Sequence, residues 1–408
     1  MKRHLRRARS FGLYVLAPLL AAVAPLLVIP ATTARYGAAG WSSIAIGLSS
    51  GLVAAVIGEL GWSIVGPQQV ARRPQDASDV YDRALAARVI VVVPLAALSA
   101  ALAVVLAPHH ALAAGLVAAG VTLGALSPAW YFTGLNRPHL TLATESLPRV
   151  VLVGGAAVGI ACGGALELYG IALIVGGILP LALATSIARV RCVPSAAAVR
   201  AVPTTLRAQW ALVAGRGATT MYRALPTPIL AVIAPDLVAL YAALDRPLRL
   251  GLQFLTAVPQ RLQAWVAVED DTVRVRRTRR ALVANVVSGV AAGGVFASAM
   301  PLVAPVLYSG TVNVTAALSV PGGVLVAVIC ASRGFGLALV ADGRAGVTVV
   351  AALAAAAIGL PAIVFGAIGA GAAGVIAALV LAEFVGIVVQ WAKLTPRSRP
   401  RDLQEVSA

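Results

Sequence analysis

Apolar runs, each about the length of a membrane-spanning helix, follow one another along almost the whole chain. A helix needs about 20 mainly apolar residues to cross the hydrocarbon core of a bilayer, so 408 residues leave room for about twelve such helices and little else. We therefore predict an all-α integral membrane protein without a folded soluble domain. The expected spans are residues 11–31, 43–65, 87–107, 111–131, 146–164, 168–188, 209–233, 237–258, 281–307, 318–341, 345–366 and 372–392.

Charged residues are scarce and lie in short clusters between these runs. They make up 12% of the chain, against about 25% in soluble domains. The net charge of +17 does not indicate nucleic-acid binding, which needs a folded basic face. The three cysteines and four histidines show no spacing typical of a metal or redox site. We expect no metal, no cofactor and no nucleic-acid partner.

The distribution of basic residues predicts how the chain is oriented. With the N-terminus in the cytoplasm, 26 of the 32 Lys and Arg residues fall in inner segments, and the outer loops hold only Arg35. Basic residues gather on the cytoplasmic side of bacterial membrane proteins, so both termini are expected there. The first run follows a basic start, as in a signal peptide. Its length and the many later spans favour an uncleaved first helix.

The longest inner connections suggest how the chain is divided. We expect a six-helix bundle at 1–190, a cytoplasmic linker at 191–208, a second six-helix bundle at 209–393 and a tail at 394–408. The connections at about 189–208 and 259–280 are expected to be solvated. A faint likeness between the outer turns at 34–41 and 232–241 fits a parallel repeat, although chance similarity of two apolar hairpins explains it as well.

Five arginines fall inside expected spans. An ionisable group at this depth costs at least about 2.5–3.5 kcal/mol and usually faces a cavity or a partner. Because the planar guanidinium group suits phosphate, an excess of arginines indicates a cavity for a phosphate-bearing anion. Alternatively, each arginine extends to the interface or pairs with a neighbouring helix. The five arginines are Arg216, Arg223, Arg246, Arg249 and Arg333.

Few acidic residues accompany these arginines in the spans. Asp245 and Arg249 are four residues apart on one helix, so they are expected to pair. Glu59 and Glu383 are candidates for carrying a coupling proton or sodium ion, together with Asp245. Hydrogen bonding between helices is the simpler interpretation for both glutamates.

Three short segments, at 127–137, 35–41 and 221–246, have distinctive patterns. Together they resemble bacterial polysaccharide (O-antigen type) flippases of the multidrug/oligosaccharidyl-lipid/polysaccharide exporter superfamily. The first has a Pro-x-Trp-Tyr-Phe-x-Gly pattern, followed by a polar turn and a helix with the early arginine Arg149. The second is the first hairpin, and the third has a tyrosine in each of spans seven and eight. The chain departs from that family in its abundance of Ala, Val and Gly. The segments are Ser127–Arg137, Arg35–Trp41 and Met221–Arg246.

The resemblance implies two six-helix bundles around a central cavity. It also implies alternating access that carries an isoprenoid-pyrophosphate-linked oligosaccharide across the bacterial cytoplasmic membrane for cell-surface polysaccharide synthesis. Membrane lipids and a polysaccharide polymerase or glycosyltransferases would be its partners. Trp130 and Tyr131 would meet the sugars. The arginines expected to meet the pyrophosphate or acidic sugars are Arg149, Arg216, Arg223, Arg246, Arg249 and Arg333.

Two other functions compete with the flippase. An exporter of small drugs or metabolites would have the same fold, but the arginine excess disfavours organic cations. A membrane enzyme, such as a polymerase or glycosyltransferase, needs catalytic carboxylates or a sizeable outer loop, and the expected outer loops are short. The chain has no GxxxxGK[ST] nucleotide motif. We therefore expect a transporter that is neither an enzyme nor driven by ATP bound to this chain.

Overall fold

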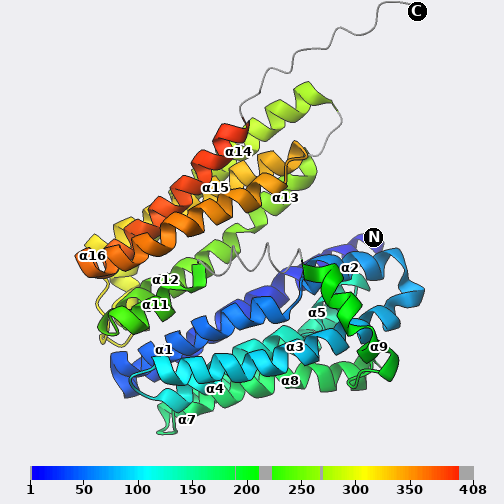
Figure 1. Cartoon of the computed structure of the whole chain (residues 1–408), viewed down its shortest axis with the longest axis horizontal. Coiled ribbons are helices and arrows are strands. Elements are labelled where there is room, and N and C mark those ends of the chain that lie inside the picture. Colours follow the sequence, from blue (N-terminus) through cyan, green and yellow to red (C-terminus); the bar gives the residue numbers. More distant parts are fainter. Residues whose placement is uncertain (1, 189, 211–222, 267–269, 395–408) are drawn as a thin grey trace, which may run out of the picture.

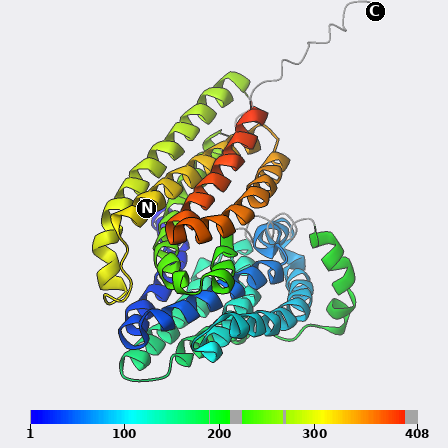
Figure 2. The same cartoon turned by 60° about the vertical axis from the view of Figure 1, so that its left-hand side comes forward.

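The computed structural model describes residues 2–188, 190–210, 223–266 and 270–394, and the secondary structure within them is helical throughout. Eight helical segments in this part are long and apolar enough to cross a membrane. This confirms the all-α membrane fold class. Figures 1 and 2 show two lobes, one built from the blue-to-green first half of the chain and one from the green-to-red second half.

Two long helices each run through two expected spans, so with the other six membrane-length segments they account for ten of the twelve. In helix α1 (Lys2–Gly58), the helical geometry breaks at Gly37, whose φ is 62°. Because Leu26 and Leu52 line one cavity, the chain folds back on itself at this kink (Figure 1). Helix α16 (Gly346–Leu394) has the same device at Gly371, whose φ is 59°. Glycine adopts this left-handed backbone region without the steric cost of a Cβ atom.

The other two expected spans lie in the seventh and eighth positions. Residues 211–222 of the seventh lie outside the described part, and α11 (Pro226–Ile233) forms the end of this span. The eighth is α12 (Asp236–Leu255), a 20-residue helix with Asp245, Arg246 and Arg249 in its interior. These charges make α12 more polar than an ordinary span, which is why composition alone does not select it.

The N-terminal lobe places α1, α4 and α8 side by side, with α3 and α7 flanking them. In the C-terminal lobe, α14 packs along α15, which in turn packs against α16. The other helices of the N-terminal lobe are α2 (Trp62–Arg72), α3 (Ala77–Leu106), α4 (Ala111–Leu123), α5 (Ala129–Gly134), α6 (Pro138–Thr141), α7 (Leu147–Ala161) and α8 (Glu167–Ala188). Those of the C-terminal lobe are α13 (Ala257–Val266), α14 (Asp271–Leu307) and α15 (Ala316–Ala341).

The connection at 189–208 was expected to be solvated, and most of its described residues are exposed, but a few of them pack against the lobe. Its short helix α9 (Ala196–Arg200) packs against α3. The backbone N–H of Ser195 donates a hydrogen bond to Asp82 Oδ1 at 3.1 Å. Ala198 and Val202 are buried in a hydrophobic cluster of the N-terminal lobe. These buried apolar side chains therefore anchor the connection to the lobe.

The second connection, at 259–280, is also largely helical in its described residues. It contains most of α13 and the first part of α14. Helix α14 has 37 residues, nearly twice the length that a span needs. The span was expected to begin at 281, where the charged residues stop. The helix instead begins at Asp271, within the charged segment.

The two lobes contact each other near the ends that are predicted to face outward. The rings of Trp41 and Tyr308 lie 5.5 Å apart. The Thr33 hydroxyl donates a hydrogen bond to Ser309 Oγ at 3.3 Å. These contacts join α1 to the segment that follows α14, and they close the space between the lobes on that side.

Close contact between α14 and α15 depends on glycine. A Cβ atom on Gly293 would lie 2.3 Å from the Gly323 carbonyl oxygen, whereas one on Gly294 would meet no atom within 4 Å. The small-residue spacing of α14 predicted such an approach. The structure shows that Gly293 makes this contact and that Gly294 faces away from it.

We expect Gly293→Ala to lower the thermal unfolding midpoint of the detergent-purified protein. The new methyl group would press on the Gly323 backbone, and overpacking of this kind costs about 1–3 kcal/mol. Gly294→Ala is the matched control, because it adds the same atom one residue away in open space and should not lower the midpoint. Equal midpoints for the two variants would contradict the proposed close contact.

Candidate functional site

Three adjoining cavities share lining residues where the lobes meet. One of about 410 Å³ borders the N-terminal lobe, one of about 230 Å³ borders the C-terminal lobe, and one of about 230 Å³ lies between them. Leu52 lines all three, and Arg249 and Gln253 line the second and third. The three cavities together form one site with walls from both lobes.

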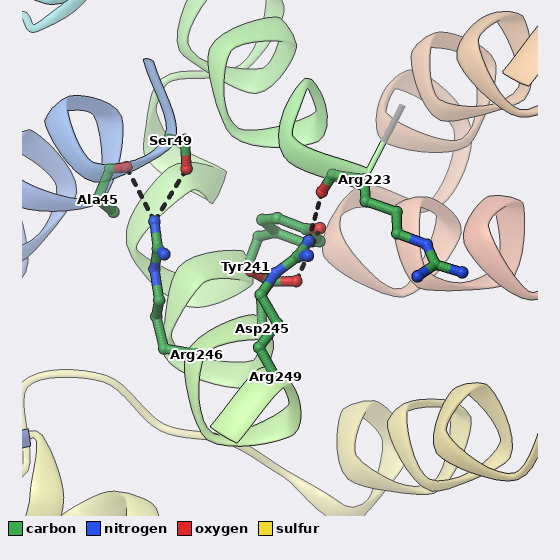
Figure 3. Close-up of polar contacts among 7 residues, drawn as sticks. All are labelled: Ala45, Ser49, Arg223, Tyr241, Asp245, Arg246 and Arg249. Carbon is green, nitrogen blue, oxygen red and sulfur yellow. Dashed lines mark hydrogen bonds and ion pairs between the residues drawn. The ribbon is translucent and has the colours of Figure 1, made fainter. Parts of the chain in front are cut away.

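The wall from the C-terminal lobe contains two ion pairs. Arg223 Nη2 lies 2.7 Å from Glu383 Oε1, and this pair joins the segment just before α11 to α16. Arg249 Nε lies 2.5 Å from Asp245 Oδ2 within α12, as the spacing predicted. Arg249 also donates to the backbone carbonyl oxygen of Arg223, whose own side chain points away from Arg249 (Figure 3). The hydroxyl of Tyr241 donates to Asp245 Oδ1 at 3.3 Å.

Arg246 points in a different direction from Arg249, although both extend from α12. Its Nη2 donates to Ser49 Oγ at 2.9 Å and to the Ala45 carbonyl at 3.4 Å, both in α1 of the other lobe (Figure 3). Arg246 lines the cavity between the lobes. One helix thus presents one guanidinium group to each lobe.

Arg333 completes the basic surface of the C-terminal lobe. It extends from α15, and its Nη1 donates to the Leu252 carbonyl of α12 at 2.9 Å. It lines the same cavity as Arg223 and Arg249. Arg216, which was expected at this site, lies outside the described residues.

The wall from the N-terminal lobe has its own charged groups. Arg88 is buried and donates to the carbonyl oxygens of Ala125 and of Ser127, the latter at 3.0 Å. Glu145 accepts a hydrogen bond from the Ser127 hydroxyl. Glu59 and Arg149 line the same cavity as these residues. Arg149 makes no hydrogen bond or ion pair with any other residue that the structure describes.

Arg88 and Glu145 were not among the predicted site residues. Arg88 was assigned to an inner connection because it lies at the very edge of the expected span 87–107, whereas α3 begins ten residues earlier, at Ala77. The apolar positions Tyr81, Ala84 and Leu85 repeat at helical spacing before Arg88, and this signal extends the helix. Glu145 lies in a π-helical turn, Leu142–Ser146, whose side-chain directions a regular α-helical pattern does not give.

The two predicted aromatic residues have different surroundings. Trp130 lines the cavity of the N-terminal lobe, and its ring lies 5.3 Å from Trp62 and 6.1 Å from Tyr81. Tyr131 is buried in the same aromatic cluster, with its ring 4.9 Å from that of Tyr81. Trp130 therefore faces the cavity, and Tyr131 supports the wall behind it.

The charges around the three cavities leave a positive excess. Six arginines and four acidic residues line them in the described part of the chain. Charges interact more strongly here than in bulk water, because apolar helices surround the site. The site can therefore hold an anion through paired guanidinium donors. Its charged residues are Arg88, Arg149, Arg223, Arg246, Arg249, Arg333, Glu59, Glu145, Asp245 and Glu383.

We expect the Asp245–Arg249 pair to be coupled energetically. Asp245→Asn and Arg249→Gln should each lower the free energy of unfolding, because each leaves a charged partner in the cavity wall. The double variant should lose less than the sum of the two, by about 0.5–3 kcal/mol. Chemical unfolding of all four proteins in detergent measures this difference. Strict additivity would show that the two residues are not coupled.

No protein-family model and no curated protein matches this sequence. Solved structures of membrane transporters match its fold. The lipid II flippase MurJ in an inward closed conformation matches with a TM-score of 0.66 and 12% identity, over 94% of this chain and 87% of that chain. An inward-facing multidrug resistance MATE family transporter of the MOP superfamily matches with a TM-score of 0.65 and 12% identity, over 93% and 94%.

The eukaryotic MATE transporter AtDTX14 matches with a TM-score of 0.52 and 15% identity, over 96% of each chain. Each of these matches covers at least 87% of both chains. At identities of 12–15% they show a shared fold. The chain is a multi-pass membrane protein with the two-lobe helical fold of the MurJ flippase and the MATE transporters.

Proposed function

We propose that this protein is a flippase that carries an isoprenoid-pyrophosphate-linked oligosaccharide across the bacterial cytoplasmic membrane by alternating access. The observation that carries the proposal is the arginine excess in the cavity between the lobes. Both termini would lie in the cytoplasm, and the product would serve cell-surface polysaccharide synthesis. A polymerase or glycosyltransferases would then act on the same lipid-linked substrate.

Pyrophosphate suits the C-terminal wall of the cavity. Arg223 and Arg249 line the same cavity, together with their ion-pair partners Glu383 and Asp245. A pyrophosphate group offers oxygen acceptors to both guanidinium groups. Hydrogen bonds to charged groups contribute about 1.5–3 kcal/mol each. In our proposal Arg333 and Arg216 increase the positive potential, and Arg246 meets the substrate where the lobes join.

The N-terminal wall suits the sugars. There Arg88 and Arg149 are balanced by Glu59 and Glu145, so this wall has no net charge. Carboxylates and guanidinium groups can both bond to sugar hydroxyls, and Trp130 offers an aromatic face. In this proposal Arg149 binds an acidic sugar or hydroxyl groups, and Tyr131 holds Trp130 in place.

Alternating access gives the inter-lobe contacts a mechanical role. Contacts such as that of Trp41 with Tyr308 close the predicted outer side, so the substrate would enter from the cytoplasmic side. Opening the outer side then requires the lobes to separate there, and the bond between Arg246 and Ser49 must break. Glu59, Asp245 and Glu383 are the groups through which a proton or sodium ion could drive this change.

Export of small drugs or metabolites is the second candidate function. It is supported by the likeness to the MATE family transporter, whose TM-score of 0.65 nearly equals that of MurJ. The four cavity acids would then have to attract a cation past six arginines. Since the potential of the cavity is positive, the cavity favours an anionic substrate over a cationic drug.

We expect Arg223→Ala and Arg249→Ala to slow flipping by about tenfold or more each, since a loss of 1.4 kcal/mol corresponds to a factor of ten. The assay uses vesicles that contain the purified protein and a fluorescent undecaprenyl-pyrophosphate glycan, and it follows the glycan into the opposite leaflet. Arg200→Ala, in the exposed part of α9, is the control and should flip normally.

Three results would distinguish the two functions. Faster flipping that is lost in Arg223→Ala supports the flippase. Full flipping by the double variant Arg223→Ala/Arg249→Ala would show that these arginines do not bind the substrate. Export of a small organic cation without glycan flipping would assign the chain to the drug exporters, and the arginines would then have a structural role.

A further inference from the structure

A fourth cavity lies at the far end of the C-terminal lobe, away from the inter-lobe contacts. Its volume is about 720 Å³, and it lies between the start of α14 and the ends of α15 and α16. These helix ends lie together in both Figure 1 and Figure 2. None of its lining residues lines the three cavities described above. It is therefore separate from the proposed transport site.

Three arginines and one aspartate give this cavity a positive excess. Arg274 and Arg279 extend from α14, and Arg344 and Asp342 follow α15. Arg344 Nε lies 3.4 Å from Asp342 Oδ2, so it partly neutralises that carboxylate. The rest of the lining is mainly apolar, including Leu282 and Leu394. The cavity thus combines a basic rim with an apolar floor.

Some arginines at this end of the lobe have partners within the protein, but Arg279 does not among the described residues. Arg277, also on α14, supports the α13–α14 corner, because its Nη1 donates to the Trp265 carbonyl at 2.8 Å. Arg344 caps α16 by donating to the Lys393 carbonyl. The end of α15 is closed by its own backbone, where Arg344 N–H donates to the Leu339 carbonyl at 2.8 Å. Arg279 has no hydrogen bond or ion pair among the residues that the structure describes.

An exposed apolar stripe continues from Arg279 along α14. Val283, Val287 and Val290 follow it at spacings of four, four and three residues, so all four lie on one helical face. The three valines are exposed in the isolated chain. Their stripe is a surface for lipid chains, and Arg279 lies at its charged end.

The length of α14 puts Arg279 at headgroup depth. The helix ends at Leu307, 28 residues after Arg279, which is about 42 Å at 1.5 Å per residue. A bilayer with its headgroups is about 40–45 Å thick. When Leu307 lies at the predicted outer surface, Arg279 lies among the headgroups of the opposite leaflet. The valine stripe then lies beside the acyl chains.

We propose that this cavity binds the headgroup of an anionic phospholipid from the leaflet predicted to be cytoplasmic. Arg274 and Arg279 donate to the phosphate, Leu282 and Leu394 contact the glycerol end of the lipid, and an acyl chain lies along the valine stripe of α14. Basic pockets between helices on the cytoplasmic side suit such headgroups. A free phosphate ion would satisfy the arginines but would leave the apolar floor and the stripe uncovered.

The test is a lipid titration of the full chain in detergent, followed by native mass spectrometry and by thermal unfolding. The probes are phosphatidylglycerol, phosphatidylcholine with the same acyl chains, and inorganic phosphate. We expect tight binding and a higher unfolding midpoint with phosphatidylglycerol alone. The double variant Arg274→Gln/Arg279→Gln should bind it about tenfold more weakly or worse, since each basic residue near an anionic lipid contributes comparably.

Arg191→Gln/Arg200→Gln is the matched control. It removes the same charge from exposed positions of the N-terminal lobe that line neither the cavity nor the valine stripe, and it should bind the lipid normally. Arg279→Gln alone provides a second variant should the double variant unfold. Equal weakening in both double variants, equal binding of the two lipids, or full replacement of the lipid by inorganic phosphate would each overturn the proposal. The transport substrate is absent, so the result is independent of flipping.

Discussion

A guanidinium group in the hydrocarbon core of a bilayer must be surrounded by polar atoms, because leaving it exposed to lipid costs at least about 2.5–3.5 kcal/mol. In this protein five of the cavity arginines donate to carboxylates, hydroxyls or backbone carbonyls. Arg246 obtains its partners from the opposite lobe, and Arg333 obtains its partner from a neighbouring helix. The other three find their partners within their own lobe. The helices can therefore carry these charges because polar atoms meet them inside each lobe and where the lobes join.

Much of the fold could be predicted from the chain because its physical basis is local. A span is visible as a run of apolar residues, and the pairing of Asp245 with Arg249 follows from helical spacing. The kink at Gly37 was harder to predict from the sequence. A turn was expected there, but the helix continues on both sides of this single residue. The packing of α9 onto α3 depends on contacts between segments over a hundred residues apart, which a single sequence does not record.

The candidate site was predictable in part for similar reasons. Arginines in the middle of an apolar run, such as Arg223 and Arg333, stand out without any knowledge of their neighbours. Arg88 did not, because it lies near the boundary between a charged helical extension and its apolar continuation. The partner of Arg223 was also hidden, since Glu383 is 160 residues away. Spacing gives pairs within a helix, whereas pairs between helices require the tertiary fold.

The short connections on the predicted outer side limit how the protein can be probed from outside the cell. Helices α11 and α12 are joined by only two residues, Ala234 and Pro235, and α1 and α16 reverse at glycine kinks. Among the described connections on that side, the longest is 308–315, between α14 and α15. An epitope tag, a protease site or a fluorophore would have the most room there. Tyr308 and Ser309 contact α1, so a label in this loop would report on lobe separation and would also affect it.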